Sequence, residues 1–261
     1  MKTINNLQLI IPRWPIPDSV KSIVTTRKNG FSQPPYDSFN LASHVNDNLA
    51  HVQQNRDKLN QLLATPAKWL NQIHSLNIIE FDEFNHISNK NKIIDADGVY
   101  SLKRNQVCSI LTADCLPILF CSKDGSAIAA IHAGWKGLAM GIINQAIKTL
   151  SATSKLPAEQ FLVWLGPAIS KQHFEVGLDV KLQFINNNPA YKTAFTKKLN
   201  QPTKENKYLA DIYQLARINL QQLGVTAIYG GDFCTYADPQ RFFSYRRDGF
   251  TGRMAALIWK I

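Results

Sequence analysis

Short apolar runs separated by polar turns recur along the chain, and most of them are too short to be helices. Strands are predicted from these runs at 20–26, 76–81, 107–112, 118–121, 127–132, 161–165, 227–229 and 255–259. The run at 127–132 combines small and branched residues, which predicts a strand buried on both faces. Pro117 lies between two of the runs and is expected to interrupt strand pairing, because proline has no N–H to donate.

Longer segments between the strands predict helices. They lie at 52–63, 138–150, 179–185 and 208–223. Gly224 follows the last of them, where glycine commonly ends a helix. Residues 187–207 are polar and basic and are predicted to form a mobile excursion. Because strands and helices are mixed rather than strictly alternating, and the composition shows no boundary, the pattern predicts one α+β domain over residues 1–261.

Composition and charge narrow the class of protein. The chain has 261 residues, of which 45% are hydrophobic and 18% charged, as is usual for globular proteins. No apolar run approaches the roughly 18 residues of a membrane span, and the N-terminus lacks the features of a signal peptide. We therefore expect a cytoplasmic protein that does not bind membranes. The basic residues behind the net charge of +10 are scattered along the chain, which argues against nucleic-acid binding. A basic surface also suits phosphate-bearing substrates, and the charge alone does not decide between these partners.

Three potential metal ligands lie beside predicted strands: His74, Cys115 and His132. A single histidine is more often a satisfied polar residue, and a single cysteine is more often a small buried hydrophobe. Their shared position at the edges of apolar runs lets all three converge on one point. Two imidazoles and one thiolate make a three-ligand zinc set that leaves a fourth position for water or substrate.

The residue inventory excludes two related metal chemistries. A multicopper oxidase of the blue laccase type needs about ten histidines, several in His-x-His pairs, because copper favours imidazole. This chain has six histidines and no such pair. A zinc deaminase of the cytidine type needs His-x-Glu and Pro-Cys-x-x-Cys, and neither motif is present.

A second group of residues lies at 242–253, where Arg246, Arg247 and Arg253 occur with two glycines. Arginine offers forked donors that match phosphate, and glycine permits close backbone approach, so the segment is a candidate anion cradle. The alternative is a hairpin turn with solvated arginines. Arg27, beside a predicted turn, is a further candidate for holding an anion.

Seven motifs occur in order along the chain: Thr25–Arg27, Phe39–Val45, Gln72–His74, Thr112–Pro117, Ile131–Gly137, Leu165–Ile169 and Phe243–Met254. Together they resemble one known family, YfiH/YlmD. That family has been described as laccase-like polyphenol oxidase, peptidoglycan editing factor and purine nucleoside phosphorylase. The motifs cover nearly the whole chain in the family's order. The sequence departs from the family at Lys28-Asn29-Gly30, which keeps one glycine of a usual pair, and at Ser75, where the family often has glycine.

The resemblance implies a single α+β domain with central mixed β-sheets flanked by helices. It implies zinc, with copper possible, held by the residues His74, Cys115 and His132. It also implies phosphorolysis of adenosine, inosine and S-methyl-5'-thioadenosine, with adenosine deaminase activity. Nucleoside and phosphate would then be the small-molecule partners of a monomer or homodimer.

Roles for individual residues follow from the chemistry and the resemblance together. The catalytic candidates are Cys115, Asp114, His132 and Arg253. The candidates for binding substrate or phosphate are Arg27, Asn40, Gln72, Arg246 and Arg247. Asp114 is either a proton carrier or a structural partner for a nearby backbone amide.

Three alternatives stay open from the sequence. In the first, Cys115 is the nucleophile and His132 the base of a cysteine hydrolase that edits peptidoglycan precursors. In the second, copper in the same site oxidises phenols. In the third, the protein binds metal without catalysis. Metal content separates the first from the zinc enzyme, because a zinc-bound thiolate is a poor free nucleophile.

Overall fold

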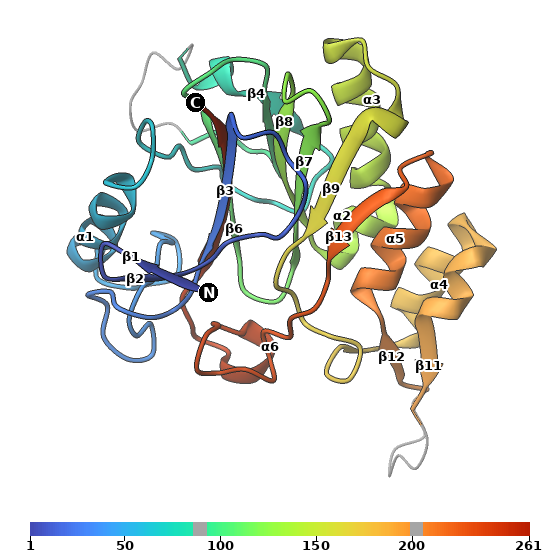
Figure 1. Ribbon diagram of the computed structural model, residues 1–261. Coiled ribbons are helices and arrows are strands. Elements are labelled where there is room, and N and C mark those ends of the chain that lie inside the picture. The colour runs from blue at the N-terminus through green and yellow to red at the C-terminus, as the bar shows by residue number, and fades with distance from the viewer. Residues whose placement is uncertain (86–92, 199–205) are drawn as a thin grey trace.

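The computed structural model describes residues 1–85, 93–198 and 206–261, which form two stacked β-sheets with helices on both outer sides (Figure 1). The α+β class with mixed sheets is confirmed. No helix in these described ranges is both long enough and apolar enough to cross a membrane.

The first sheet has five antiparallel strands and joins the two ends of the chain. Its order is β1 (Lys2–Ile4), β2 (Leu7–Ile10), β3 (Val20–Thr25), β14 (Met254–Lys260) and β6 (Val107–Thr112). One face packs on helix α1 (Leu49–Asn60), where Leu9, Ile23, Leu59 and Leu257 share a core. The other face packs on the second sheet.

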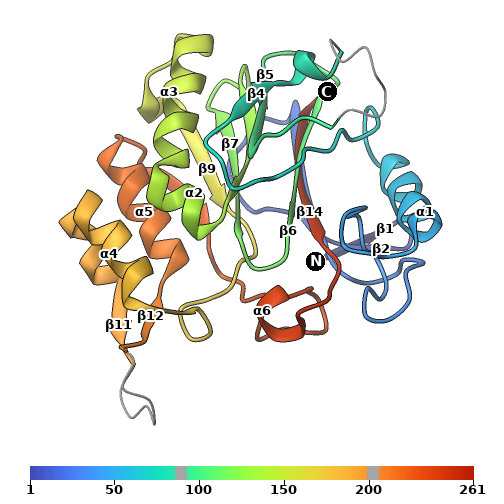
Figure 2. The ribbon, with the colours of Figure 1, turned by 180° about the vertical axis from the view of Figure 1, so that it is seen from behind.

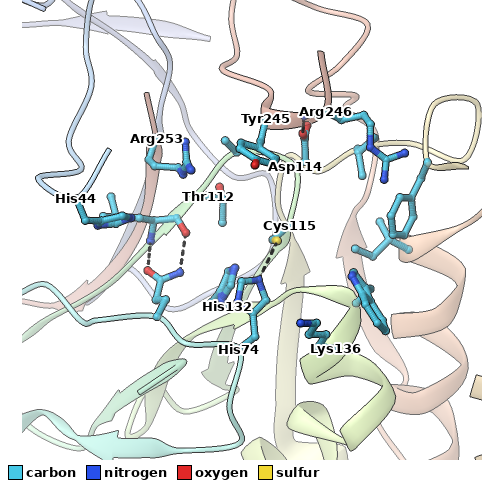
Figure 3. A pocket seen from close by; sticks show the side chains of 17 residues that line it. His44, His74, Thr112, Asp114, Cys115, His132, Lys136, Tyr245, Arg246 and Arg253 are labelled. Atoms are coloured by element: carbon cyan, nitrogen blue, oxygen red, sulfur yellow. Dashed lines mark hydrogen bonds between the residues drawn. The ribbon is translucent and has the colours of Figure 1, made fainter. Parts of the chain in front are cut away.

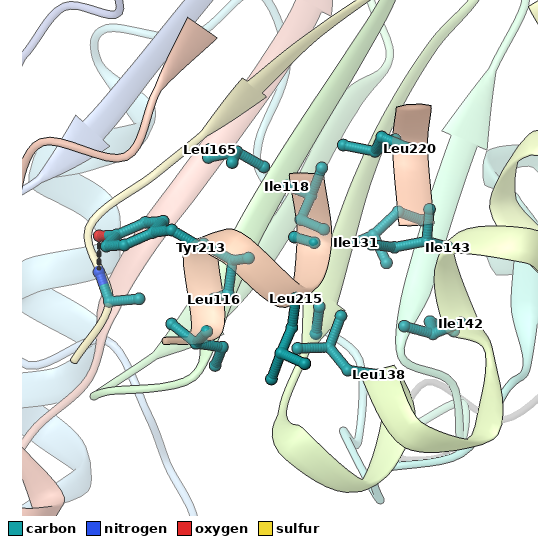
Figure 4. Close-up of a cluster of buried hydrophobic side chains, with 14 of the residues drawn as sticks. Leu116, Ile118, Ile131, Leu138, Ile142, Ile143, Leu165, Tyr213, Leu215 and Leu220 are labelled. Carbon is teal, nitrogen blue, oxygen red and sulfur yellow. Dashed lines mark hydrogen bonds between the residues drawn. The ribbon is translucent and has the colours of Figure 1, made fainter. Parts of the chain in front are cut away.

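The second sheet has six strands and is mixed, with a parallel pair at each edge. Its order is β13 (Ala227–Gly230), β9 (Phe161–Leu165), β7 (Leu116–Ser122), β8 (Ile128–Ala133), β5 (Gly98–Ser101) and β4 (Ile78–Glu80). Strands β7 and β8 are buried along their whole length. Because side chains alternate along a strand, Ile118 and Ile131 face the helices (Figure 4) and Leu119 and Ala130 face the first sheet.

A helical layer covers the outer face of the second sheet. Its helices are α2 (Trp135–Met140), α3 (Ile142–Ser154), α4 (Leu178–Asn187) and α5 (Ile212–Gln222). A small sheet of β10 (Glu175–Val176), β12 (Tyr208–Ala210) and β11 (Phe195–Lys197) lies beside α4. The remaining short helices are η1 (Phe81–Asn85), η2 (Ala158–Gln160), η3 (Pro189–Ala194) and α6 (Tyr245–Asp248).

All eight predicted strands are present, but two predicted helices differ from the structure. The helix predicted at 138–150 is two helices, because Gly141 adopts a left-handed conformation with φ 97° between α2 and α3. The helix predicted at 208–223 begins only at Ile212, after the strand β12. The side chain of Asp211 accepts from Gln214 N and so caps the start of α5.

Two further predictions are corrected by the tertiary structure. Pro117 does not interrupt β7: it lies within this strand, opposite His132 of β8. Pairing with β9 starts one residue later, at Ile118, so the missing N–H of Pro117 breaks no ladder. The predicted excursion at 187–207 contains η3 and β11, with Tyr191 and Ala194 buried. Its residues 199–205 lie outside the described residues.

Candidate metal and anion site

A cavity of about 590 Å³ lies where the chain passes from one sheet to the other. Strand β6 of the first sheet ends at Thr112 and β7 of the second begins at Leu116, so the link between them carries Asp114 and Cys115 into this junction. Both residues line the cavity. Asp114 has a positive φ of 94°, which marks the sharp turn that the link makes between the two sheets.

The three predicted metal ligands meet in this cavity (Figure 3). The ligand atoms of His74, Cys115 and His132 lie within 4.8 Å of one another, and Cys115 Sγ lies 3.8 Å from His74 Nε2. We refer to these residues as the His–Cys–His group. His132 belongs to β8, whereas His74 lies in the loop before β4 with a positive φ of 60°. Within the described ranges, this is the one cluster of three or more such side chains that can hold a metal ion.

One buried carboxylate, Asp97, organises two of these ligands. Asp97 Oδ1 accepts from His132 Nδ1 at 2.8 Å and from the backbone N–H of His74 at 3.0 Å. Asp97 Oδ2 accepts from the hydroxyl of Ser75 at 2.8 Å. Burial opposes ionisation of Asp97, but the hydrogen bonds from His132 and Ser75 outweigh it and hold its pKa below the ordinary value. The Asp97 contact leaves the other ring nitrogen of His132 for the cavity, an arrangement common behind metal-bound histidines.

The thiol of Cys115 is poised to ionise. Burial raises its pKa, but the charges and hydrogen bonds of His132 and His74 outweigh burial and lower the pKa of Cys115 to about 6. In turn, the Cys115 thiolate and Asp97 overcome the burial of His132 and raise its pKa. A thiolate flanked by two imidazoles is a donor set suited to zinc.

Gly134 leaves room for this group. A Cβ atom at this position would lie 2.6 Å from His74 Cδ2 and 3.2 Å from Cys115 Sγ, which is too close for either neighbour to keep its place. Zinc bond lengths of about 2.0–2.3 Å place two ligands of one ion roughly 3.3–3.6 Å apart, near the observed contact of Cys115 with His74. The residues present therefore fit a bound metal ion.

Two of the predicted arginines line the same cavity. The Arg253 Nη1 atom donates to the carbonyls of Thr251 and Gly252 at 2.8 and 3.1 Å. Among the described residues, no carboxylate oxygen lies within 4.0 Å of the Arg253 guanidinium. Arg246 donates to the carbonyl of Glu175 at 2.9 Å. The cavity thus holds two guanidinium groups that form no ion pair within 4.0 Å among the described residues.

Asp114 lines the cavity, but both of its carboxylate oxygens accept hydrogen bonds from other protein groups. Oδ1 accepts from the Thr235 hydroxyl at 2.6 Å. Oδ2 accepts from the Ser244 hydroxyl at 3.0 Å and from the Arg246 backbone N–H at 2.7 Å. These contacts match the structural alternative for Asp114 and fix the segment that carries Arg246. That segment forms the short helix α6, not a hairpin.

The other predicted binding residues make internal contacts. Arg27 forms an ion pair with Asp37 at 3.1 Å and stacks over Phe243, and Arg247 donates to Asp248 and to three backbone carbonyls. Asn40 is fully buried and accepts from the Arg253 backbone N–H at 2.9 Å. Gln72 lines the cavity, while both ends of its amide bond the backbone of Leu111. Of these four, Gln72 alone reaches the cavity wall.

Residues that sequence reasoning did not select also line the cavity. They include His44, Trp135, Lys136, Phe174, Ile212 and Tyr245. Figure 3 shows His44 and Arg253 on one side of the His–Cys–His group and Arg246 and Lys136 on the other. His44 and Lys136 lie in motifs that the family resemblance included. The sequence therefore drew attention to these segments but did not predict that the two side chains line the cavity. Asp97 carried no comparable sequence signal.

Comparison with known proteins supports the resemblance. Residues 21–261 match the family described as multi-copper polyphenol oxidoreductase laccase. The chain is 42% identical to purine nucleoside phosphorylase PA4543 of Pseudomonas aeruginosa over 250 residues, which cover 96% of this chain and 97% of that protein. It is 44% identical to purine nucleoside phosphorylase YfiH of Escherichia coli K12 over 256 residues, covering 97% of this chain and 99% of that protein.

Solved structures share the fold over the same extent. The protein NMB0706 of Neisseria meningitidis superposes with a TM-score of 0.89 at 43% identity, covering 97% of this chain and 98% of that one. YlmD of Geobacillus stearothermophilus gives a TM-score of 0.79 at 27% identity, covering 93% and 92%. The similarity therefore includes both sheets and the junction between them.

Proposed function

This chain belongs to the multi-copper polyphenol oxidoreductase laccase family, which includes YfiH and YlmD, and from that membership we propose that it is a zinc-dependent purine nucleoside phosphorylase. Two of its relatives are named for that activity. The observation that carries the proposal is one cavity that joins the His–Cys–His group to Arg253, a guanidinium without a carboxylate partner among the described residues. Phosphorolysis needs an anion held beside the glycosidic bond, and this cavity offers the charge for it.

We assign phosphate to the side of the cavity formed by Arg253 and His44. Burial, and then the positive charges of Arg253 and Arg56, hold the pKa of His44 below its ordinary value. His44 is therefore neutral near pH 7 and offers one donor and one acceptor, which suits a phosphate that carries a proton. Asn40 positions this side by fixing the Arg253 backbone.

The purine fits the opposite side, where apolar and basic groups meet. Trp135, Phe174 and Ile212 supply flat and apolar surface, and the Arg246 guanidinium lies 5.6 Å over the Phe174 ring. Negative charge develops on the base as the bond to C1′ breaks. Arg246 and Lys136 are the cationic groups on that side to stabilise it.

Zinc would be held by His74, Cys115 and His132, and when bound it supplies Lewis-acid polarisation at its open position. The chain's own residues orient that position. Asp97 fixes the ring of His132 and the loop that carries His74. Adenosine, inosine and S-methyl-5'-thioadenosine are the proposed substrates, and adenosine deaminase activity is proposed for the same cavity.

The deciding experiment incubates the purified protein with adenosine or inosine, with and without phosphate, and separates the products by chromatography. We expect free purine and ribose 1-phosphate only when phosphate is present, and some inosine from adenosine in both cases. His132→Ala is the control, and elemental analysis accompanies both proteins. The proposal is wrong if neither base nor inosine appears while a phenol or a muropeptide precursor is turned over efficiently.

One observation favours a second candidate, a cysteine hydrolase. Cys115 lies 3.8 Å from one imidazole, and the charges of His74 and His132 lower its pKa to about 6, as in an activated nucleophile. Protein that is active after complete removal of metal would favour this hydrolase. Copper-dependent phenol oxidation gains less support, because the described residues provide one three-ligand cluster and a multi-copper enzyme needs several.

A further inference from the structure

A second cavity of about 560 Å³ lies among the four helices that cover the six-stranded sheet. Figure 2 shows α2, α3, α4 and α5 together on that side of the molecule. The cavity is lined by the C-terminal end of α2, the first turns of α3, the C-terminal ends of α4 and α5, and parts of the adjoining segments. It shares no lining residue with the cavity of the His–Cys–His group.

The lining is rich in side-chain amides and carries one cation. The amides belong to Asn144, Gln145, Asn187, Asn188, Asn219 and Gln222, and the cation is Lys148. No aspartate, glutamate, histidine or cysteine of the described residues is among the lining. The described lining therefore lacks the carboxylates, imidazoles and thiols that most often transfer protons or bind metals, and it is suited to binding a polar molecule.

Asn219 is the feature that points to a ligand. Its side chain is 8% exposed, lines the cavity, and makes no hydrogen bond with any described residue. By contrast, the buried Asn55 donates to Ser32, Ser38 and Asn40 and accepts from the Phe31 backbone. The amide atoms of Asn219 are accessible from the cavity, because neither is among the fully buried side-chain atoms that lack a partner. A molecule in the cavity would supply the partners that Asn219 lacks.

The free polar atoms around Asn219 include donors and acceptors. Gln222 Oε1 accepts from Asn188, which leaves the Gln222 Nε2 donor for the cavity. Asn187 Nδ2 donates to the Ala139 carbonyl, which leaves the Asn187 Oδ1 acceptor. Hydroxyl groups satisfy both kinds of atom, because each one donates and accepts. A polyhydroxylated molecule is therefore the best match.

Lys148 adds a preference for negative charge. It lies on the exposed face of α3, four residues after Asn144, and so reaches the same cavity. No carboxylate oxygen lies within 4.0 Å of its ammonium group in the part of the chain that the structure describes. An anionic substituent on the ligand would pair with it.

We propose that this cavity binds a phosphorylated sugar, with the hydroxyls on the amides around Asn219 and the phosphate on Lys148. Ribose 1-phosphate, a product of the proposed reaction, is such a molecule. This link between the second cavity and the reaction rests on the proposed function. The two cavities share a structural element: Trp135 and Lys136 of α2 line the first, and Leu138 and Met140 line the second. Sugar phosphate bound at the C-terminal end of α2 would therefore contact the helix that also shapes the catalytic cavity.

Calorimetric titration of the intact, metal-loaded protein with ribose 5-phosphate tests the proposal. The titration uses Arg253→Gln protein, which weakens binding in the first cavity. We expect one equivalent to bind, and Asn219→Asp and Lys148→Gln each to weaken it about tenfold or more. Asn186→Asp is the matched control, since it adds the same charge on α4 outside the cavity and should leave binding within about twofold. Ribose and inorganic phosphate should each bind more weakly than ribose 5-phosphate.

The proposal is overturned if ribose 5-phosphate does not bind to the Arg253→Gln protein, or if binding is unchanged in Lys148→Gln. Lys148 is exposed, so this variant gives a clear answer even if Asn219→Asp fails to fold. Because binding is measured without turnover, the result stands apart from the proposed function. If the wild-type protein shows no phosphorolysis but binds ribose 5-phosphate in a way that depends on Lys148, the proposed function is wrong and the proposed sugar-phosphate site stands.

Discussion

The two cavities have nearly the same volume, about 590 and 560 Å³, yet their linings differ in kind. The first gathers three histidines, a cysteine and two arginines where the sheets meet. The second gathers amides and one lysine between helices. Volume thus says little about chemistry. The difference lies in whether buried groups hold ionisable side chains in fixed positions.

Buried carboxylates supply that support at the first cavity. Asp97 fixes two metal-candidate residues, and Asp114 fixes the helix that carries Arg246. At the second cavity the corresponding buried polar residue is Asn219, which has no partner among the described residues. The protein itself therefore preorganises the first cavity, whereas the amide of Asn219 at the second is not held by any described residue.

The largest expected effect comes from removing a member of the His–Cys–His group. Cys115→Ala and His132→Ala should each lose bound metal and lower turnover by roughly 10³-fold or more, because the open metal position disappears. Elemental analysis and product chromatography provide the measurements. His51→Ala, in α1 and outside both cavities, should keep its metal. Full metal content in Cys115→Ala would remove that residue from the ligand set.

The next effect concerns the reactivity of two cysteines in metal-free protein. His132 and His74 lower the pKa of Cys115 to about 6, so its alkylation by iodoacetamide should rise with pH, reach half its maximum near pH 6 and level off above it. An ordinary cysteine reaches half its maximum rate near pH 8.5. Burial raises the pKa of Cys108, which should stay unmodified. Mass spectrometry of each site at several pH values is the measurement, and a Cys115 midpoint near 8.5 would contradict the thiolate.

A smaller effect is expected at the carboxylate behind the metal ligands. Asp97→Asn keeps the shape but loses the charge that orients His132, and it should weaken metal affinity by about 10- to 100-fold. Competition with a chromogenic chelator measures it. Asp95→Asn is the matched control, because the Asp95 carboxylate bonds Asn71 and not a metal-candidate side chain. Equal affinities for the two variants would show that Asp97 does not orient the site.

The smallest effects separate two arginines of one segment. Arg253→Gln should raise the KM for phosphate about tenfold with little change in Tm, because its guanidinium faces the cavity. Arg247→Gln should instead lower the free energy of unfolding by about 1–3 kcal/mol, because it loses bonds to Asp248 and three carbonyls. Steady-state kinetics and thermal unfolding of both variants provide the comparison. If Arg247→Gln raises the KM for phosphate and Arg253→Gln instead lowers the free energy of unfolding, phosphate binding has been assigned to the wrong arginine.

The sequence alone was sufficient to predict eight strands and the metal-candidate residues, but it missed β1, β2, β5 and the three strands of the small sheet. Strand runs such as 118–121 and 161–165 are apolar along their length, so their burial could be predicted from residue type. His74, Cys115 and His132 could be selected because few side chains can bind a transition metal. The family resemblance pointed to the same three residues.

Tertiary structure decided what each polar residue does, because hydrogen-bond partners come from distant parts of the chain. Nothing local distinguishes Arg253, which faces the cavity, from Arg247, which bonds the carbonyls of Thr235 and Tyr236. Asp97 and His132 are 35 residues apart, and their contact exists only because β5 pairs with β8. Even the break at Gly141 and the strand position of Pro117 depend on neighbours that periodicity does not reveal. The sequence determined which side chains were available for chemistry, and the packing of the two sheets determined which of them meet.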